Sequence, residues 1–133
     1  DSATNMSALK KFNEAFDEFH RRGWWFHIFP EACRWDFYKP LRPFQKGAFT
    51  MSYKYNKPLL PCVITFRERK GIFRLFGSKN LPLLTVTIGE PILPDTTKPR
   101  KIEVERLREV AHNQMIKMAG ITHNPWPAAW ENL

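Results

Sequence analysis

The sequence contains no long hydrophobic run. Its longest apolar stretches lie at residues 24–26 and 59–66, and Pro61 and Thr65 interrupt the second. A helix that spans a bilayer needs about 20 consecutive apolar residues, so no spanning helix is expected. The N-terminal Asp-Ser-Ala-Thr-Asn also lacks the basic and apolar regions of a secretory signal peptide.

Cysteine is also scarce. The two cysteines, Cys33 and Cys62, are too few for a disulfide-stapled secreted domain, which favours a reducing compartment. Neither they nor the four histidines have the spacing of a zinc site. We therefore expect no metal site.

Acidic residues are depleted in one part of the chain. The 133 residues carry 21 Lys and Arg against 13 Asp and Glu, a net charge of +8, and the length suits one domain. Residues 34–79 hold eleven of the basic residues and two acids. A concentrated positive block favours an anionic partner, such as a nucleic acid, a phosphorylated metabolite or an acidic membrane surface.

The hydrophobic pattern predicts an α/β chain. Apolar residues three and four apart indicate an amphipathic helix over Ser7–Arg22, whose Phe residues we expect in the core and not in an acyl channel. After Gly23, the run Trp24–Phe29 predicts a buried strand, with His27 as a hydrogen-bonded core residue. Helix, glycine and strand in this order are typical of an α/β unit.

Further elements follow along the chain. The pattern predicts a short helix at Gly47–Asn56, strands at Leu59–Phe66 and Leu83–Ile88, and a helix at Lys101–Ala119. The last helix presents one apolar face, made of Val104, Leu107, Ala111, Met115 and Met118. We therefore expect a mixed β-sheet flanked by helices. A basic segment, Arg67–Leu81, separates the last two strands as a solvated loop or as a segment on an anionic membrane.

The loop after the first predicted strand contains two charged candidates, Glu31 and Arg34. Ligands of open α/β sheets bind in the loops that follow the strands. The guanidinium of Arg34 matches the geometry of a phosphate, and Glu31 suits a role in orienting Arg34 or binding a hydroxyl. The alternative is an ordinary salt bridge within the loop.

Four motifs, in order, resemble those of one family. Residues 29–34, Phe-Pro-Glu-Ala-Cys-Arg, resemble the Phe-Pro-Glu-Gly-Thr-Arg-Ser block of the glycerolipid acyltransferases, the lysophosphatidic acid (1-acylglycerol-3-phosphate) acyltransferase group. Residues 41–49 contain a similar Lys-Gly-Ala-Phe, residues 57–64 a similar proline-bearing strand, and residues 89–92 a similar Gly-Glu-Pro-Ile. The resemblance spans about residues 23–95.

The sequence also departs from the family pattern. Ala32, Cys33 and Trp35 stand where the family usually has Gly, Thr and Ser. The catalytic His-x4-Asp motif of the family is absent, because no histidine here is followed five positions later by aspartate. In the family this motif lies upstream of the Phe-Pro-Glu block. The resemblance therefore implies that the chain is the C-terminal part of one acyltransferase domain, without a catalytic residue of its own.

This interpretation divides residues 1–133 into four parts. They are a helix at 1–22, strands with an acceptor-binding loop at 23–95, a C-terminal helix at 99–120 and a tail at 121–133. The implied reaction moves an acyl group from acyl-CoA or acyl carrier protein, as co-substrate, to 1-acylglycerol-3-phosphate in phospholipid biosynthesis. The implied acceptor-binding residues are Glu31, Arg34, Arg42, Lys46 and Gly47.

The resemblance implies no cofactor. It implies work on lysophospholipid at the cytoplasmic face of the cell membrane, with an anionic membrane surface as partner and no nucleic acid. Two alternatives stay open. One is a basic nucleic-acid-binding module, in which cations follow phosphates and aromatic rings stack on bases. The other is a non-catalytic acyltransferase-like protein.

Overall fold

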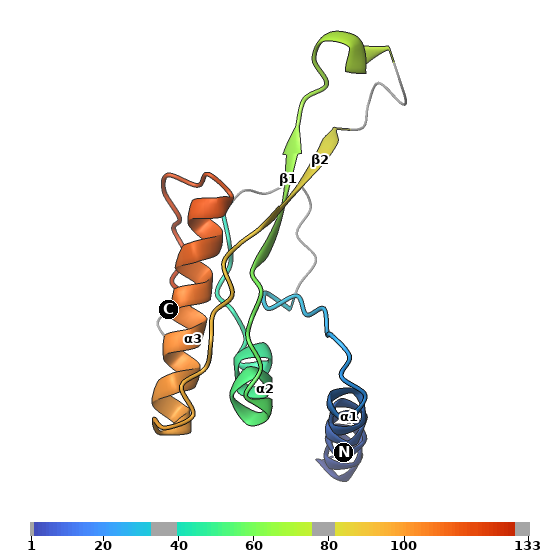
Figure 1. The fold of residues 1–133 in the computed structure, drawn as a ribbon, viewed down its shortest axis with the longest axis vertical. Coiled ribbons are helices and arrows are strands. Elements are labelled where there is room, and N and C mark those ends of the chain that lie inside the picture. Colours follow the sequence, from blue (N-terminus) through green and yellow to red (C-terminus); the bar gives the residue numbers. More distant parts are fainter. Residues whose placement is uncertain (1, 33–39, 76–81, 130–133) are drawn as a thin grey trace.

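Three α-helices and one β-hairpin make up the part of the fold that the structure describes (Figure 1). The computed structural model of the chain describes residues 2–32, 40–75 and 82–129. The elements are, in chain order, α1 (Ser2–Arg21), α2 (Gly47–Tyr55), β1 (Cys62–Arg67), the 3₁₀ helix η1 (Gly71–Arg74), β2 (Leu83–Ile88) and α3 (Arg100–Met118). This composition confirms the predicted mixed α/β class.

The core lies between α2, α3 and the segment that precedes α2. Phe44 and Leu107 are fully buried, and Phe49, Ile92 and Val104 are nearly so. The predicted face of α3 is confirmed, because Val104, Leu107 and Ala111 are buried while Met115 and Met118 are half-buried. The three- and four-residue spacing of these side chains places them on one stripe that packs against α2 and residues 41–49.

The two strands pair antiparallel, with Ile64 opposite Val86. Leu59 and Ile92 extend the pairing by two main-chain hydrogen bonds of 2.8 and 2.9 Å, outside the strands proper. β1 therefore begins three residues later than predicted. Pro61 lies in the gap, and it lacks the N–H that a continuous ladder requires. Val63 on β1 is buried, on the side of the hairpin opposite Ile64.

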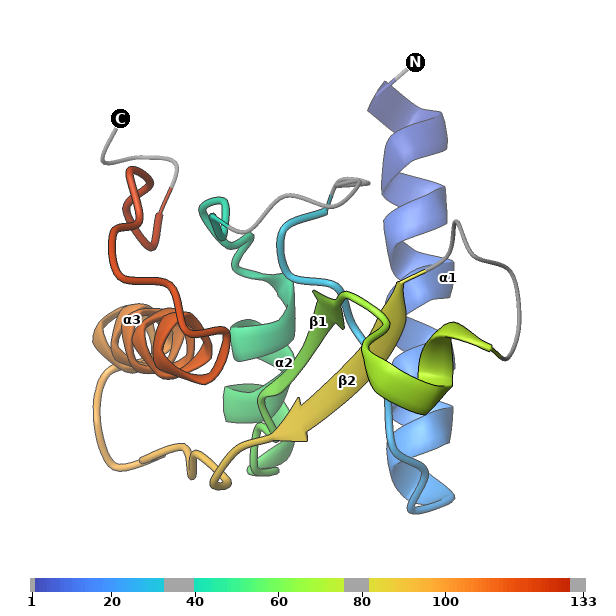
Figure 2. The same cartoon turned by 90° about the horizontal axis from the view of Figure 1, so that it is seen from above.

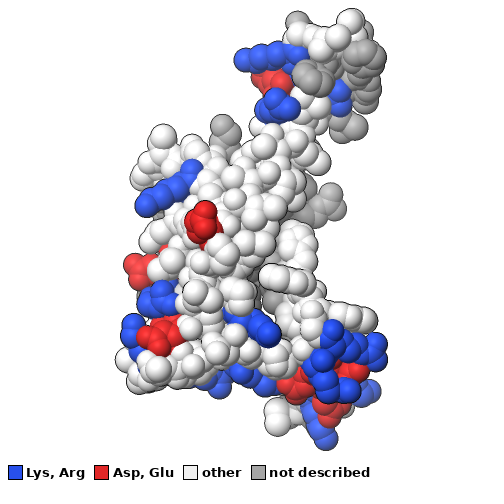
Figure 3. Space-filling model, in the orientation of Figure 1, with Lys and Arg blue, Asp and Glu red and all other residues white. Residues whose placement is uncertain are grey.

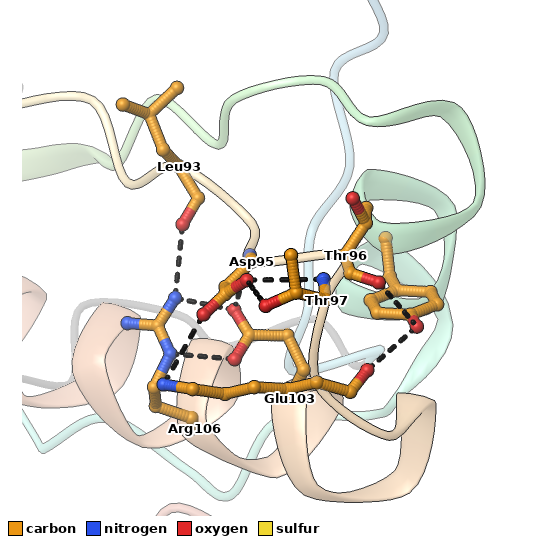
Figure 4. A network of polar contacts seen from close by, with 8 residues as sticks. Leu93, Asp95, Thr96, Thr97, Glu103 and Arg106 are labelled. Carbon is orange, nitrogen blue, oxygen red and sulfur yellow. Dashed lines mark hydrogen bonds and ion pairs between the residues drawn. The ribbon is translucent and has the colours of Figure 1, made fainter.

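A polar network fixes the connector between β2 and α3 (Figure 4). Glu103, fully buried on the first turn of α3, accepts hydrogen bonds from the Asp95 N–H at 2.8 Å and from Arg106 Nε at 2.8 Å. Arg106 also donates to the Leu93 carbonyl at 3.0 Å. The Arg106 hydrogen bonds hold the pKa of Glu103 below its ordinary value, against the opposing effect of burial. The network thus orients α3 against the strand end.

The extended segment 24–29 corrects the first predicted strand. It forms no strand, and Trp25 is 78% exposed. His27 is exposed and its ring lies 4.6 Å from that of Phe29, so the prediction of a buried core histidine is wrong. The sheet that the structure describes contains only β1 and β2, and without a neighbouring strand the apolar residues of segment 24–29 have little to pack against.

Helix α1 begins earlier than predicted and lies on the side of the molecule away from α3 (Figure 2). Its Phe residues do not form the expected core, because Phe12 is exposed and Phe16 and Phe19 are half-buried. They contact mainly one another, Trp24 and Phe26. None of the helices in the described part of the chain is both long and apolar enough to span a membrane.

Candidate functional site

The two ends of the candidate loop lie side by side. The Gln45 N–H donates to the Pro30 carbonyl at 2.7 Å, and the Arg42 N–H donates to Glu31 Oε2 at 2.9 Å. These bonds hold residues 30–31 beside residues 42–45. Arg34, with the rest of residues 33–39, lies outside the described residues.

Glu31 is half-buried at the base of this loop. Burial raises the pKa of its carboxyl above the ordinary value, and the Arg42 N–H and the Arg42 charge partly offset the rise. Its hydrogen bond links two backbone segments that are eleven residues apart. The described geometry therefore gives Glu31 a loop-closing contact, which the sequence did not indicate.

Ala32 adopts the left-handed region, with φ of +52°. An L-residue there brings Cβ close to the following carbonyl oxygen, whereas glycine has no such cost. This is the position at which the resembling block of the acyltransferases has glycine. Alanine is thus an unfavourable residue for this left-handed turn.

Arg42 is half-buried under the tail of the chain. Its guanidinium carbon lies 5.6 Å from the centre of the Trp126 ring, within range of a cation–π interaction. Asn124 fixes the same place by donating to the Leu41 carbonyl at 2.9 Å. The tail has no periodic pattern, so this contribution could not be predicted from the sequence.

Lys46 and Gly47 lie at the start of α2. Lys46 Nζ is 3.4 Å from Glu105 Oε1 on α3, and Glu105 also pairs with the buried Arg108. Gly47 is exposed, and a Cβ at this position would meet nothing within 4 Å. The structure thus brings Glu31, Arg42, Lys46 and Gly47 to one region, with Lys46 bound to a carboxylate.

An apolar groove of about 390 Å³ opens beside Gly47. It runs between α1, the extended segment and α2, and its lining is Phe12, Phe16, His27, Ile28, Phe29, Gly47, Ala48 and Met51. The sequence signal for it was the Phe spacing of α1, which we interpreted as core packing. The half-exposed state of that face leaves room for an apolar ligand chain.

The basic block is divided in space (Figure 3). Lys54 Nζ lies 2.6 Å from Asp17 on α1, Lys46 pairs with Glu105 on α3, and Arg67 and Lys70 lie at the hairpin tip. The described members of the block therefore do not form one continuous positive footprint. The described residues also contain no group of three or more His, Cys, Asp or Glu side chains arranged to hold a metal ion.

Comparison with known proteins gives one match. The family model described as Acyltransferase matches residues 3–65, which include α1, the candidate loop and α2. No curated protein and no solved structure matches the chain. The matched segment is just under half of the chain and contains the Phe-Pro-Glu and Lys-Gly-Ala-Phe motifs, so this part of the chain is similar to the Acyltransferase family.

Proposed function

We propose that the chain supplies the acceptor-binding part of an acyltransferase that acts on 1-acylglycerol-3-phosphate. The observation that carries this proposal is the closed base of the candidate loop, where Glu31 and Pro30 hold the returning segment at Arg42 and Gln45. This base lies within the family match. Arg34, three residues beyond Glu31 in the sequence, belongs to the loop that this base closes.

We assign binding of the acceptor phosphate to Arg34, with Arg42 and Lys46 as further cations that attract it. A guanidinium binds phosphate oxygens in pairs, which gives orientation as well as affinity. The N-terminus of α2 adds main-chain N–H groups and a partial positive charge in the same region. Lys46 has a weaker claim, because Glu105 already neutralises it.

The apolar groove suits the hydrocarbon chain of the acceptor. It opens at Gly47 and is lined almost wholly by carbon atoms, His27 being its one ionisable residue. A lysophospholipid with its phosphate at the loop would extend its acyl chain along this groove. Transfer of that chain from water to an apolar lining is favourable in proportion to the area buried.

In the proposed reaction the free hydroxyl of the acceptor attacks the carbonyl carbon of an acyl thioester, from acyl-CoA or acyl carrier protein. The hydroxyl proton passes to a general base and the new ester C–O bond forms. The C–S bond then breaks, and the thiolate takes up the proton and leaves as the thiol. We assign no catalytic residue within these 133 residues, because no histidine has aspartate five positions later. We also propose that the chain works at the cytoplasmic face of the cell membrane, where its lipid substrate lies.

The test is a binding measurement on the full 133-residue chain. The ligands are a short-chain, monomeric 1-acylglycerol-3-phosphate and the matching monoacylglycerol, which lacks only the phosphate. We expect the phosphorylated ligand to bind at least about tenfold more tightly, and Arg34→Ala to remove this preference. Lys101→Ala, at an exposed position of α3, is the control and should leave the preference unchanged.

Two results would contradict the proposal. One is equal affinity for both ligands in the unaltered chain. The other is steeply salt-dependent binding of single-stranded DNA with no response to either lipid, which would favour the nucleic-acid-binding alternative. The same chain should also transfer no acyl group from a thioester, and turnover would overturn the assignment of the general base outside these residues.

A further inference from the structure

The β1–β2 hairpin projects from the body of the molecule (Figures 1 and 3). Its tip, described as far as Leu75, includes two exposed apolar side chains. Ile72, within η1, is 63% exposed, and Leu75, which follows it, is 80% exposed. Neither side chain is needed for the core described above. Exposed large apolar residues grouped on a projecting element are typical of an interaction surface.

One face of the hairpin is also apolar. Phe66 pairs with Leu84 and Ile64 with Val86 in the antiparallel register, so these four residues lie on one face. All four are exposed. The face that is more buried contains Val63 and the threonines of both strands. The usual order of apolar inside and polar outside is therefore reversed in this hairpin.

Positive charge surrounds the apolar tip. Arg67 and Lys70 are exposed and, with Glu68 and Leu83, line an open hollow of about 510 Å³. Neither cation forms an ion pair with a residue that the structure describes, whereas Lys46 and Lys54 each face a carboxylate in the body. Between Arg67 and Lys79 the sequence has five basic residues and one acid. The described part of the tip is thus apolar at Ile72 and Leu75 and cationic at Arg67 and Lys70.

We propose that the hairpin tip docks on an anionic phospholipid bilayer, with Ile72 and Leu75 in the interface and Arg67 and Lys70 against lipid phosphates. Apolar burial and attraction to anionic lipid act together at such a surface, and one basic residue contributes roughly a fivefold gain in partitioning. This goes beyond the proposed function, since it names the surface that meets the membrane and does not involve the acceptor site.

Charge favours an anionic bilayer over a second copy of the chain as the partner of the tip. Contact between the tips of two copies would bring Arg67 and Lys70 of each close to the same residues of the other, and like charges repel. A bilayer that contains anionic lipid offers the opposite charge together with an apolar interior. Such a bilayer therefore complements both the apolar and the cationic residues of the tip.

The experiment is vesicle flotation of the full chain at low and high salt. The vesicles contain phosphatidylcholine alone or a mixture of phosphatidylcholine and phosphatidylglycerol. We expect binding to the mixed vesicles, with weaker binding at high salt. Ile72→Ser/Leu75→Ser should lower the partition coefficient by at least about tenfold. Arg67→Gln/Lys70→Gln should lower it by about twentyfold and remove most of the preference for anionic lipid.

The matched control is Leu93→Ser/Ile102→Ser. These two apolar residues are 71% and 61% exposed and lie outside the hairpin, near the N-terminal end of α3. The control should bind vesicles as the unaltered chain does. Because all the substituted side chains are exposed, the circular dichroism and thermal unfolding of every variant should match those of the unaltered chain.

Three results would overturn the proposal. They are absence of vesicle binding, an equal loss in the control variant, and a vesicle-independent dimer that the Ile72→Ser/Leu75→Ser variant dissociates. Binding of the monomeric short-chain 1-acylglycerol-3-phosphate should be unchanged in both tip variants. A failure of the acceptor proposal and a failure of the docking proposal therefore give different results.

Discussion

At the residue scale, the side chain of Ala32 makes the backbone conformation of the candidate loop unfavourable. Its φ of +52° is unfavourable for alanine. We expect Ala32→Gly to stabilise the chain by up to about 1 kcal/mol, because relief of the left-handed strain exceeds the extra entropy of glycine in the unfolded state. The free energy of unfolding from urea denaturation measures the change.

The same substitution in a helix provides the control. Ala48 lies in α2, where glycine is a poor helix former, so Ala48→Gly should destabilise by about 1 kcal/mol. The two changes are chemically identical and should have opposite signs. If Ala32→Gly destabilises the chain as much as Ala48→Gly does, the turn at Ala32 is not strained.

Glu31 gives a prediction that depends on pH. Its folded-state pKa is raised above the ordinary value by burial, so the folded state holds the proton more tightly than the unfolded state does. The stabilisation from protonation is full at low pH and is lost as pH rises through the folded pKa. Glu31→Gln keeps an acceptor oxygen for the Arg42 N–H and cannot ionise.

We therefore expect the stability of the Gln variant, relative to the unaltered chain, to increase between about pH 4 and about pH 7. Glu31→Ala removes the acceptor and should cost about 1–2 kcal/mol at neutral pH. Urea denaturation across this range tests both. A Gln variant that loses as much stability as the Ala variant at neutral pH would show that the charge itself closes the loop.

At the scale of elements, an apolar pattern predicted burial correctly where the segment has a neighbour to pack against. The apolar stripe of α3 predicted its buried face correctly, because that face has neighbours in α2 and residues 41–49. The run at 24–29 has equally apolar residues but no partner strand among the described elements. A strand requires hydrogen bonds to a second segment, and the composition of one segment does not provide them.

The hairpin shows that the sequence predicted the strands but not which of their faces is buried. Leu83–Ile88 was predicted with its observed bounds, and β1 was displaced by only a few residues. Alternation placed the apolar residues on one face, yet it did not show that this face would be the exposed one. Which face is buried depends on where α3 packs, and the packing of α3 is a long-range contact.

At the scale of the whole molecule, stability should be unevenly distributed. α3 contributes buried side chains to the core and is fixed by the Glu103 network. α1 is held by a few polar and ring contacts with α2, including Tyr55 Oη to Asp17 Oδ1 at 2.7 Å, and by its half-exposed Phe residues. Elements with few buried contacts open at a much smaller free energy than the core does.

We therefore expect the amide hydrogens of α1 to exchange at least about a hundredfold faster than those of the middle of α3, once both are corrected for intrinsic rates. Hydrogen–deuterium exchange with mass spectrometry measures this directly. Two solvent-exposed residues of equal character, Lys10 on α1 and Lys117 on α3, lie in the peptides to be compared. Equal protection of the two helices would show that α1 is an integral part of the cooperative core.

The class of the fold, the positions of α2, α3 and β2, and the motifs that resemble those of acyltransferases could all be predicted from the residues alone. These depend on local periodicity and on residue order, which are properties of the chain alone. Only the tertiary structure showed that Glu31 closes the loop onto Arg42, that Lys46 meets Glu105 and that the basic block is divided. It also exposed the apolar hairpin face. These features arise from contacts between distant segments, whose geometry is set by how α3 and the tail pack.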